Sequence, residues 1–264
     1  MSETDGLGLG WRTDLAVLRY GGSGIEEHAD HLVVRTPANP TYHWGNFVLV
    51  TDPTAVDDAD RWRARFAEEF PQARHLAVGL PGEPDRYTWA GNEIEASDVL
   101  VARSSIAGRG LPEGYTVRRV ETDQDWAAST ALNDEHYPGE HEFARLRSLT
   151  RSRLAAAGHL TWFGAFTRAG DRLVAELGIV PVEHGLARYQ SVLTHAEHRR
   201  RGLTSHLLGV AAEHARGHGA ETLVIIADAD GDAGRLYRAA GFAHTETAWQ
   251  AYSRPDQSAS SSIA

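Results

Sequence analysis

The stretch HRRRGLTSHLLGV, residues 198–210, decides how the second half of the chain is organised. Consecutive arginines lead into Gly202, and apolar residues then recur at helical spacing, starting with Leu203 and Leu207. A Gly-containing stop follows, so the sequence predicts a helix over residues 202–219. That helix begins at a glycine beside a cluster of positive charge.

The predicted helix start has the properties of an anion site. The first backbone amides of a helix have no intrahelical partner, and they carry a partial positive charge. Gly202 has no side chain to obstruct a ligand, and Thr204 and Ser205 add small hydroxyl donors. The neighbouring cations are Arg199, Arg200 and Arg201. This combination is typical of a phosphate or pyrophosphate site. The alternative is a solvated basic turn ahead of a surface helix.

The composition of the whole chain limits the classes of function. The 264 residues carry a net charge of −10, whereas nucleic-acid-binding proteins need a basic surface. Cysteine is absent, which excludes disulfides, thiolate nucleophiles and cysteine-ligated metals. The sequence has no apolar run of transmembrane length, and it begins with a polar, acidic segment unlike a signal peptide. We therefore expect a cytoplasmic protein that binds no nucleic acid and no membrane.

Strands and helices alternate along both halves of the chain, which predicts an α/β (α+β) fold with a mixed central sheet flanked by helices. In the second half, strands are expected over residues 115–120, 160–167, 172–182, 187–194, 222–228 and 242–252, and helices over 122–134, 141–158, 202–219 and 232–241. In the first half, helices are expected over 12–22 and 52–70, and strands over 30–36, 45–51 and 73–80. The Gly- and Pro-rich segment 105–114 is an expected linker. The expected organisation is a smaller N-terminal α/β domain over 1–110, a second domain over 111–254 and a disordered tail over 255–264.

Two motifs in the second half resemble those of the GNAT superfamily of acyl-CoA-dependent N-acyltransferases. The phosphate loop of that family reads Gln/Arg-x-x-Gly-x-Gly/Ala, and residues 199–204 resemble it, with Thr204 in place of the final small residue. The family's Leu-Tyr-x-x-x-Gly-Phe block is matched within RLYRAAGF, residues 235–242, with Asp230 in place of the usual preceding Asn. The resemblance covers roughly residues 115–253 and implies a GNAT-like second domain. One interpretation of the first half is a diverged second copy of this domain, which would make the chain a tandem member of the family.

The resemblance implies acetyl-CoA as co-substrate. In this fold two adjacent parallel strands separate and the pantetheine arm lies between them, so amides of the strand over 187–194 would contact the arm and the thioester carbonyl. Tyr237 would protonate the departing thiolate as general acid, with a core aromatic as the alternative. The implied cofactor contacts are Ser191, Val192, Leu193, Arg199, Arg200, Arg201, Gly202, Leu203, Thr204, Ser205 and Asp230.

Amine acylation also needs a group that removes a proton from the ammonium form. The strand over 187–194 carries no acid, whereas Glu176 lies inside an apolar strand and is our candidate base. The alternatives are a solvated, outward-facing Glu176, or a water held by Tyr189 or Gln190.

The acceptor pocket is expected at the acid-rich segment 133–143, because the resemblance implies that this region shapes the pocket. Glu135, Tyr137 and Glu140 are the predicted contacts for a cationic amine, and an ordinary polar loop is the alternative.

Histidines spaced three apart occur at His28 and His31 and again at His195 and His198. No third ligand is evident for either pair, so no metal site is predicted.

Together these features predict an N-acetyltransferase that moves the acetyl group of acetyl-CoA to a primary amine by direct attack in a ternary complex. The acceptor is a small-molecule or peptide amine, and the oligomeric state is open. The alternatives are a non-catalytic CoA-binding or regulatory module and a nucleotide-binding protein that uses the same helix start.

Overall fold

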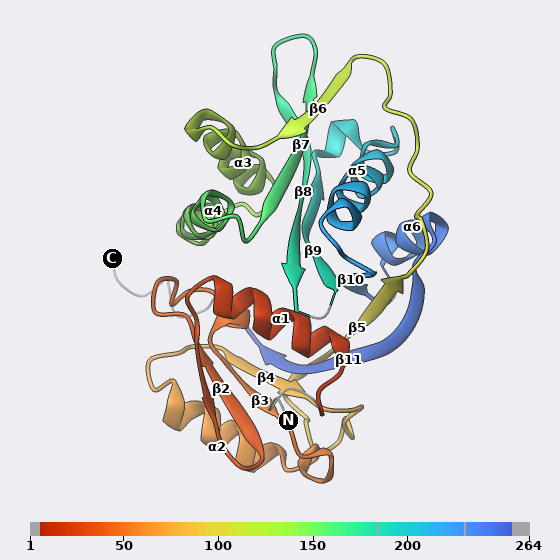
Figure 1. The fold of residues 1–264 in the computed structure, drawn as a ribbon. Helices are drawn as coiled ribbons and strands as arrows, with labels where there is room; N and C mark the ends of the chain where they lie inside the picture. Colours follow the sequence, from red (N-terminus) through yellow and green to blue (C-terminus); the bar gives the residue numbers. More distant parts are fainter. Residues whose placement is uncertain (1–5, 184, 230, 255–264) are drawn as a thin grey trace, which may run out of the picture. The chain divides into compact units, whose positions relative to one another are not determined.

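The computed structural model describes residues 6–183, 185–229 and 231–254. It divides into two compact units that interleave along the chain. The first unit comprises Gly22–Ser97 and the described parts of Met1–Arg12 and Thr247–Ala264, and the second comprises Thr13–Gly21 and Asp98–Glu246. The helix α1 (Leu9–Tyr20) and the strands β5 (Glu93–Ala102) and β11 (Ala243–Ser253) contribute residues to both units (Figure 1). The sequence predicts a contiguous division over 1–110 and 111–254.

The first unit is a small α/β layer. Its strands are β1 (Gly24–Glu27), β2 (His31–Arg35), β3 (Phe47–Val50) and β4 (Leu76–Leu80), followed in the sheet by β11. The neighbours are antiparallel except β3 and β4, which are parallel and connected through α2 (Ala59–Glu69). Trp62 and Phe66 of α2 are buried, with 1% and 3% of their surface exposed.

The second unit is built on a mixed sheet with strand order β5-β10-β9-β8-β7-β6. The strands are β6 (Tyr115–Arg119), β7 (Thr161–Thr167), β8 (Leu173–Val182), β9 (Leu186–Thr194) and β10 (Thr222–Asp228). The helices α3 (Asp123–His136) and α4 (His141–Ala156) lie on one face, and α5 (Leu203–Gly217) lies on the other (Figure 1). A short helix, α6 (Asp232–Ala240), follows β10. The predicted α/β class with a mixed, helix-flanked sheet is confirmed.

The two faces of this sheet have separate apolar cores. Ala187 and Tyr189 of β9 belong to the core beneath α5. Trp162 belongs to the core beneath α3 and α4, where Val17 and Tyr20 of α1 also pack. Because side chains of a strand alternate between faces, Arg188 points to the face of α1, α3 and α4.

Two expectations for the first half are wrong. The helix expected over 52–70 begins only at Ala59, because Asp52 accepts the amide of Thr54 and caps a separate short turn over Pro53–Ala55. The indole of Trp62 donates to the Ala55 carbonyl over 2.6 Å and holds that turn against α2. The strands β1 and β5 were not expected. β1 is short and only partly buried, whereas β5 joins a partly exposed, polar first half to a buried, apolar second half, so neither shows a continuous strand pattern.

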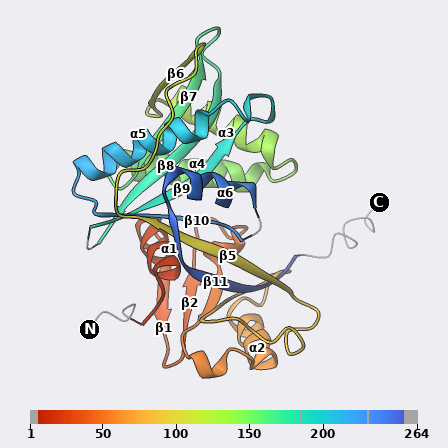
Figure 2. The same cartoon turned by 90° about the vertical axis from the view of Figure 1, so that its right-hand side faces the viewer.

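The expected linker over 105–114 has no regular structure but packs closely on α5, as Figure 2 shows. A Cβ atom added to Gly209 would lie 3.1 Å from the Gly108 Cα, so the two glycines permit a close backbone approach. The expected disordered tail, 255–264, lies outside the described residues. None of the helices in the described ranges is long and apolar enough to cross a membrane.

Candidate active site

The predicted anion site lies where β9 leads into α5, and we name residues 199–205 the phosphate loop. Gly202 is the N-cap of α5 and has φ +86°, a left-handed conformation that favours glycine. No side chain caps the helix, so the first-turn amides of Leu203, Thr204 and Ser205 are left for another acceptor. Arg200 also has a positive φ, +59°, which bends the chain tightly ahead of the helix.

The arginines of the phosphate loop are exposed and differ in their contacts. Arg199 donates to the Thr194 carbonyl over 3.2 Å and approaches the His136 Nδ1 at 3.5 Å. Burial and then the charge of Arg199 lower the pKa of His136. Arg201 donates to the Glu197 carbonyl over 3.2 Å. The loop therefore keeps its cations at the surface, beside uncapped helix amides.

The Thr204 departure from the family pattern has a local partner. Its hydroxyl oxygen lies 2.9 Å from that of Thr194, the last residue of β9. Leu203, next to it, points into the core and is 2% exposed, so only its backbone faces the loop.

The middle of β9 bulges against β8 and lies beyond the described ladder with β10. Towards β8, Glu176 is opposite Leu193 and Gly178 is opposite Gln190, so Ser191 and Val192 bulge against one residue. Ser191 has φ +48°. Towards β10, the described parallel ladder ends where Arg188 meets Val224.

From Tyr189 onward, the β10-facing edge of β9 is thus outside this ladder. The pairing of β9 with β10 thus ends before the residues whose backbone amides the family resemblance assigns to the pantetheine arm. Val192 packs towards the core of α5, and Leu193 lies in the core of α3 and α4.

Tyr237 lies on α6 and is 5% exposed. Burial raises the pKa of its phenol, and the charge of Arg188 opposes that rise. The group therefore stays protonated near neutral pH and is able to donate a proton. Asp230, the other residue implied near this helix, lies outside the described residues.

Glu176 is fully buried on β8. Its Oε1 accepts from the Asn133 side chain over 2.8 Å, and its Oε2 accepts from the Trp162 indole over 3.0 Å. The alternative of a solvated, outward-facing Glu176 is wrong, because the strand is covered by α3 at this point. Tyr189 donates to the Leu208 carbonyl over 2.8 Å and faces α5, so it lies on the other side of the sheet from Glu176.

The predicted acceptor residues lie at the end of α3 and in its connection to α4. Glu135 approaches His195 Nε2 at 3.0 Å and Arg172 at 3.3 Å, which connects α3 to the end of β9. Tyr137 is 45% exposed, and Glu140 is an exposed N-cap of α4 without a capping bond.

Sequence reasoning missed the basic side chains on this face of the sheet. Arg147 and Arg151 of α4 both donate to the hydroxyl oxygen of Ser191, over 3.0 and 2.6 Å. Arg188 of β9 donates to Asp14 of α1 over 2.7 Å. Arg188 could have been singled out from the sequence, because it is a charged residue inside the predicted strand ARYQSVLT and charged residues are seldom buried without a partner.

A metal site needs several ligand atoms close together, and the two histidine pairs differ in this respect. In the described part of the chain, the one group of three candidate ligands is His195, Glu197 and His198, with ligand atoms within 4.8 Å of one another. The Nδ1 of His195 accepts the Glu197 amide at 3.3 Å, and its Nε2 lies 3.0 Å from both a Glu135 carboxylate oxygen and the Arg172 guanidinium. The His198 Nδ1 lies 2.8 Å from the Tyr115 hydroxyl. Protein groups thus already engage these rings.

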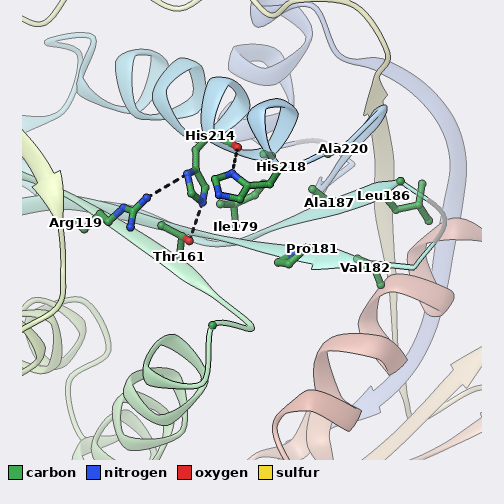
Figure 3. Close-up of a pocket in the computed structure, with 14 residues that line it drawn as sticks. Arg119, Thr161, Ile179, Pro181, Val182, Leu186, Ala187, His214, His218 and Ala220 are labelled. Atoms are coloured by element: carbon green, nitrogen blue, oxygen red, sulfur yellow. Dashed lines mark hydrogen bonds between the residues drawn. The ribbon is translucent and has the colours of Figure 1, made fainter.

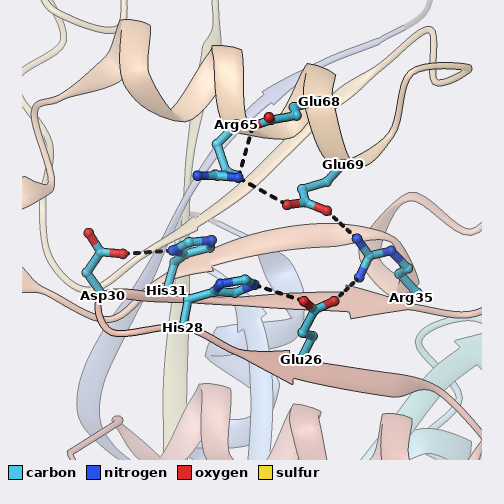
Figure 4. A network of polar contacts seen from close by, with 8 residues as sticks. All are labelled: Glu26, His28, Asp30, His31, Arg35, Arg65, Glu68 and Glu69. Carbon is cyan, nitrogen blue, oxygen red and sulfur yellow. Dashed lines mark hydrogen bonds and ion pairs between the residues drawn. The ribbon is translucent and has the colours of Figure 1, made fainter.

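The pair in the first unit is part of an ionic network, shown in Figure 4. The rings of His28 and His31 stack with centroids 4.3 Å apart. His28 faces Glu26 and His31 faces Asp30, at 3.4 and 2.8 Å. Glu26 also pairs with Arg35, which pairs in turn with Glu69 of α2. The network joins β1, β2 and α2 and accounts for the histidines structurally.

A cavity of about 370 Å³, shown in Figure 3, has none of residues 199–205 in its wall. Its wall includes Leu186 and Ala187, where β9 is still paired, and His214 near the end of α5. His214 contacts Thr161 at 2.9 Å and Arg119 at 3.4 Å. His214 lies in the last turn of α5, whereas the phosphate loop leads into its first turn. A helix of 15 residues is about 22 Å long, so this length separates the cavity from the loop. We assign the cavity no part in the anion site.

Known proteins resemble this chain in the sequence of its second unit and in its fold. Residues 125–242 match the sequence model of the Acetyltransferase (GNAT) family. That range contains the phosphate loop, the diverging part of β9 and Tyr237. The second unit therefore carries a domain of the GNAT acetyltransferase family. None of the curated proteins matches the chain.

Solved structures share the fold at low sequence identity. A GCN5-related N-acetyltransferase from Kribbella flavida superposes with a TM-score of 0.66 at 16% identity, over 93% of this chain and 95% of that one. One from Sphaerobacter thermophilus gives 0.60 at 18% identity, over 87% and 82%. A tandem GNAT protein from the clavulanic acid biosynthesis pathway gives 0.56 at 16% identity, over 88% and 83%. These likenesses extend over both units and concern the fold alone.

Proposed function

We propose that the second unit transfers the acetyl group of acetyl-CoA to a primary amine by direct attack within a ternary complex. The observation that carries the proposal is the uncapped start of α5 at Gly202, next to the diverging half of β9. Helix amides and arginines suit a pyrophosphate, and free strand amides suit the arm and the thioester carbonyl. The match of residues 125–242 to an acetyltransferase family supports the same chemistry.

In the proposed reaction, the amine nitrogen attacks the thioester carbon. The C–N bond forms, the carbonyl oxygen takes negative charge, and amides near Ser191 to Leu193 stabilise that charge. The C–S bond then breaks and the thiolate leaves. Tyr237 supplies its proton to the sulfur, and burial of Tyr237 keeps that proton in place until the thiolate forms.

We assign the proton acceptor to Glu176. Its two hydrogen-bond donors, Asn133 and Trp162, are both neutral, so the carboxylate is not neutralised by them. A carboxylate has about four acceptor positions, and these bonds fix its orientation while leaving others for a proton. Tyr137 and Glu140 remain the predicted acceptor contacts on the α3–α4 connection.

The test is release of free CoA thiol from acetyl-CoA in the presence of a panel of primary amines, for wild type and Tyr237→Phe. We expect amine-dependent release by wild type and a loss of kcat of about 10²-fold or more in the variant, with unchanged acetyl-CoA binding. Binding of acetyl-CoA without turnover on any amine would favour the non-catalytic CoA-binding module instead.

A further inference from the structure

The face of the sheet opposite α5 carries a concentration of positive charge that the transfer chemistry does not use. Arg147 and Arg151 of α4 and Arg188 of β9 gather around the bulge at Ser191, and we name these three residues the arginine cluster. All of them, and their partner Asp14, belong to the second unit.

Arg188 is the deepest member of the arginine cluster. It is 6% exposed, and its Nε and Nη1 are buried without hydrogen-bond partners, while its Nη2 donates to Asp14. Buried guanidinium donors without partners are costly, so such groups are commonly matched by an anion. Burial raises the pKa of Asp14, whereas Arg188 and Arg147 lower it, so both guanidiniums lie within electrostatic range of this one carboxyl group.

Arg147 and Arg151 are one helical turn apart and reach the same hydroxyl oxygen. The hydroxyl oxygen accepts from both, so this contact holds the two guanidiniums side by side at the bulge. Arg151 is 7% exposed, and its guanidinium lies 4.5 Å from the centre of the Trp162 ring. Arg147 and Ser191 are half-buried and give the cluster an open side.

The arginine cluster is connected to the proposed base through Trp162. Trp162, on which Arg151 stacks, donates its indole N–H to Glu176. The charge of Arg188 acts on Tyr237. An acceptor with its amine near Glu176 would therefore place a neighbouring substituent at the arginines.

We propose that the arginine cluster binds a carboxylate of the acyl acceptor, so that the substrate is an amine that also carries an acid group, as an α-amino acid does. Planar guanidiniums match the geometry of a carboxylate, and a buried arginine keeps its charge at any working pH. The acceptor class then excludes polyamines and other purely cationic amines. This inference rests on the proposed acetyl transfer.

The experiment compares matched acceptors: a panel of L-α-amino acids, their carboxamides, the corresponding decarboxylated amines and aminophosphonate analogues. We expect kcat/KM with acetyl-CoA to be at least about tenfold higher for the acids than for the carboxamides, since a charge-assisted contact is lost in the amide. Equal rates for acids and carboxamides, or faster reaction of decarboxylated amines or phosphonates, would overturn the proposal.

Arg147→Gln and Arg151→Gln locate the effect, with Arg145→Gln as matched control, because Arg145 is exposed on the same helix and pairs with Glu142. We expect the first two changes to remove the preference for acids by raising KM for the acids only, and the control to keep it. A preserved preference in both would overturn the assignment. Thermal stabilisation by acetyl-CoA alone, measured on every variant, distinguishes a failure of the proposed transferase from a failure of the arginine assignment. If acetyl-CoA does not stabilise the wild type, the proposed transferase is contradicted. If it does but acids are not preferred, only the arginine assignment is contradicted.

Discussion

The hydroxyl oxygens of Thr194 and Thr204 lie 2.9 Å apart and join the end of β9 to the first turn of α5. Thr204 stands where the family motif has Gly or Ala, and its side chain is thus directed to β9. Its backbone amide stays in the uncapped first turn.

Thr204→Ala is expected to keep acetyl-CoA affinity within about twofold and to lower the free energy of unfolding by about 1 kcal/mol, the usual value of one hydrogen bond. Isothermal titration and denaturant unfolding measure the two quantities. A loss of affinity beyond tenfold would mean that the hydroxyl itself contacts the ligand.

Gly202→Ala tests the start of the helix. At φ +86° a Cβ atom is strained, which costs about 1 kcal/mol. The new methyl group would lie 3.6 Å from the Arg109 side chain, an ordinary contact, so strain rather than a clash is the expected cause. We expect reduced stability and weaker acetyl-CoA binding, because relief of the strain turns the loop amides.

The matched control is Gly217→Ala near the other end of α5, where an added Cβ meets nothing within 4 Å. Alanine in a helix is favoured over glycine by about 0.5–1 kcal/mol, so this variant is expected to unfold at a higher temperature and to bind acetyl-CoA normally. Equal effects of both changes on binding would argue against a ligand site at Gly202.

Glu176→Gln removes the proposed base and retains the shape of the side chain. We expect kcat to fall by about 10²- to 10⁴-fold, with acetyl-CoA affinity unchanged. Glu142→Gln, at an exposed carboxylate on α4, is the control. A Glu176 variant with wild-type turnover would move the base to another group.

Asp125 gives the fold a specific pH dependence. Burial raises the pKa of this carboxyl group. Its hydrogen bonds lower the pKa by more than burial raises it, and they come from Arg118, the amides of Thr122 and Glu121 and the Thr122 hydroxyl. The net shift is therefore downward from the ordinary 3.8. A lowered folded-state pKa stabilises the fold above about pH 4, and that stability is lost as the pH falls through the folded-state value. We expect Asp125→Asn to be destabilised at pH 7 and the difference from wild type to shrink below pH 4. Chemical denaturation at both pH values checks this, and a constant difference would contradict it.

Local features of the sequence predicted the helix of α5 and its glycine start, because helical periodicity and glycine positions are short-range signals. The separation of β9 from β10 after Arg188 was expected only from the family resemblance, since strand pairing is set by distant residues. The contacts of Arg147 and Arg151 could not be predicted for the same reason, because the sequence of their helix alone indicates a solvated, basic face. Glu176 was singled out by sequence as a charge in an apolar strand, but its partners Asn133 and Trp162 come from other elements.

The most direct test of the central claim is thermal unfolding of the full chain with acetyl-CoA and, separately, with ATP, for wild type and a variant with Arg199, Arg200 and Arg201 reversed in charge. We predict that acetyl-CoA at about 100 times its dissociation constant stabilises the wild type by about 2.7 kcal/mol, that ATP does so far less, and that the reversed variant loses the effect. Equal stabilisation by ATP, or an unchanged response of the variant to acetyl-CoA, would contradict a CoA site at the start of α5.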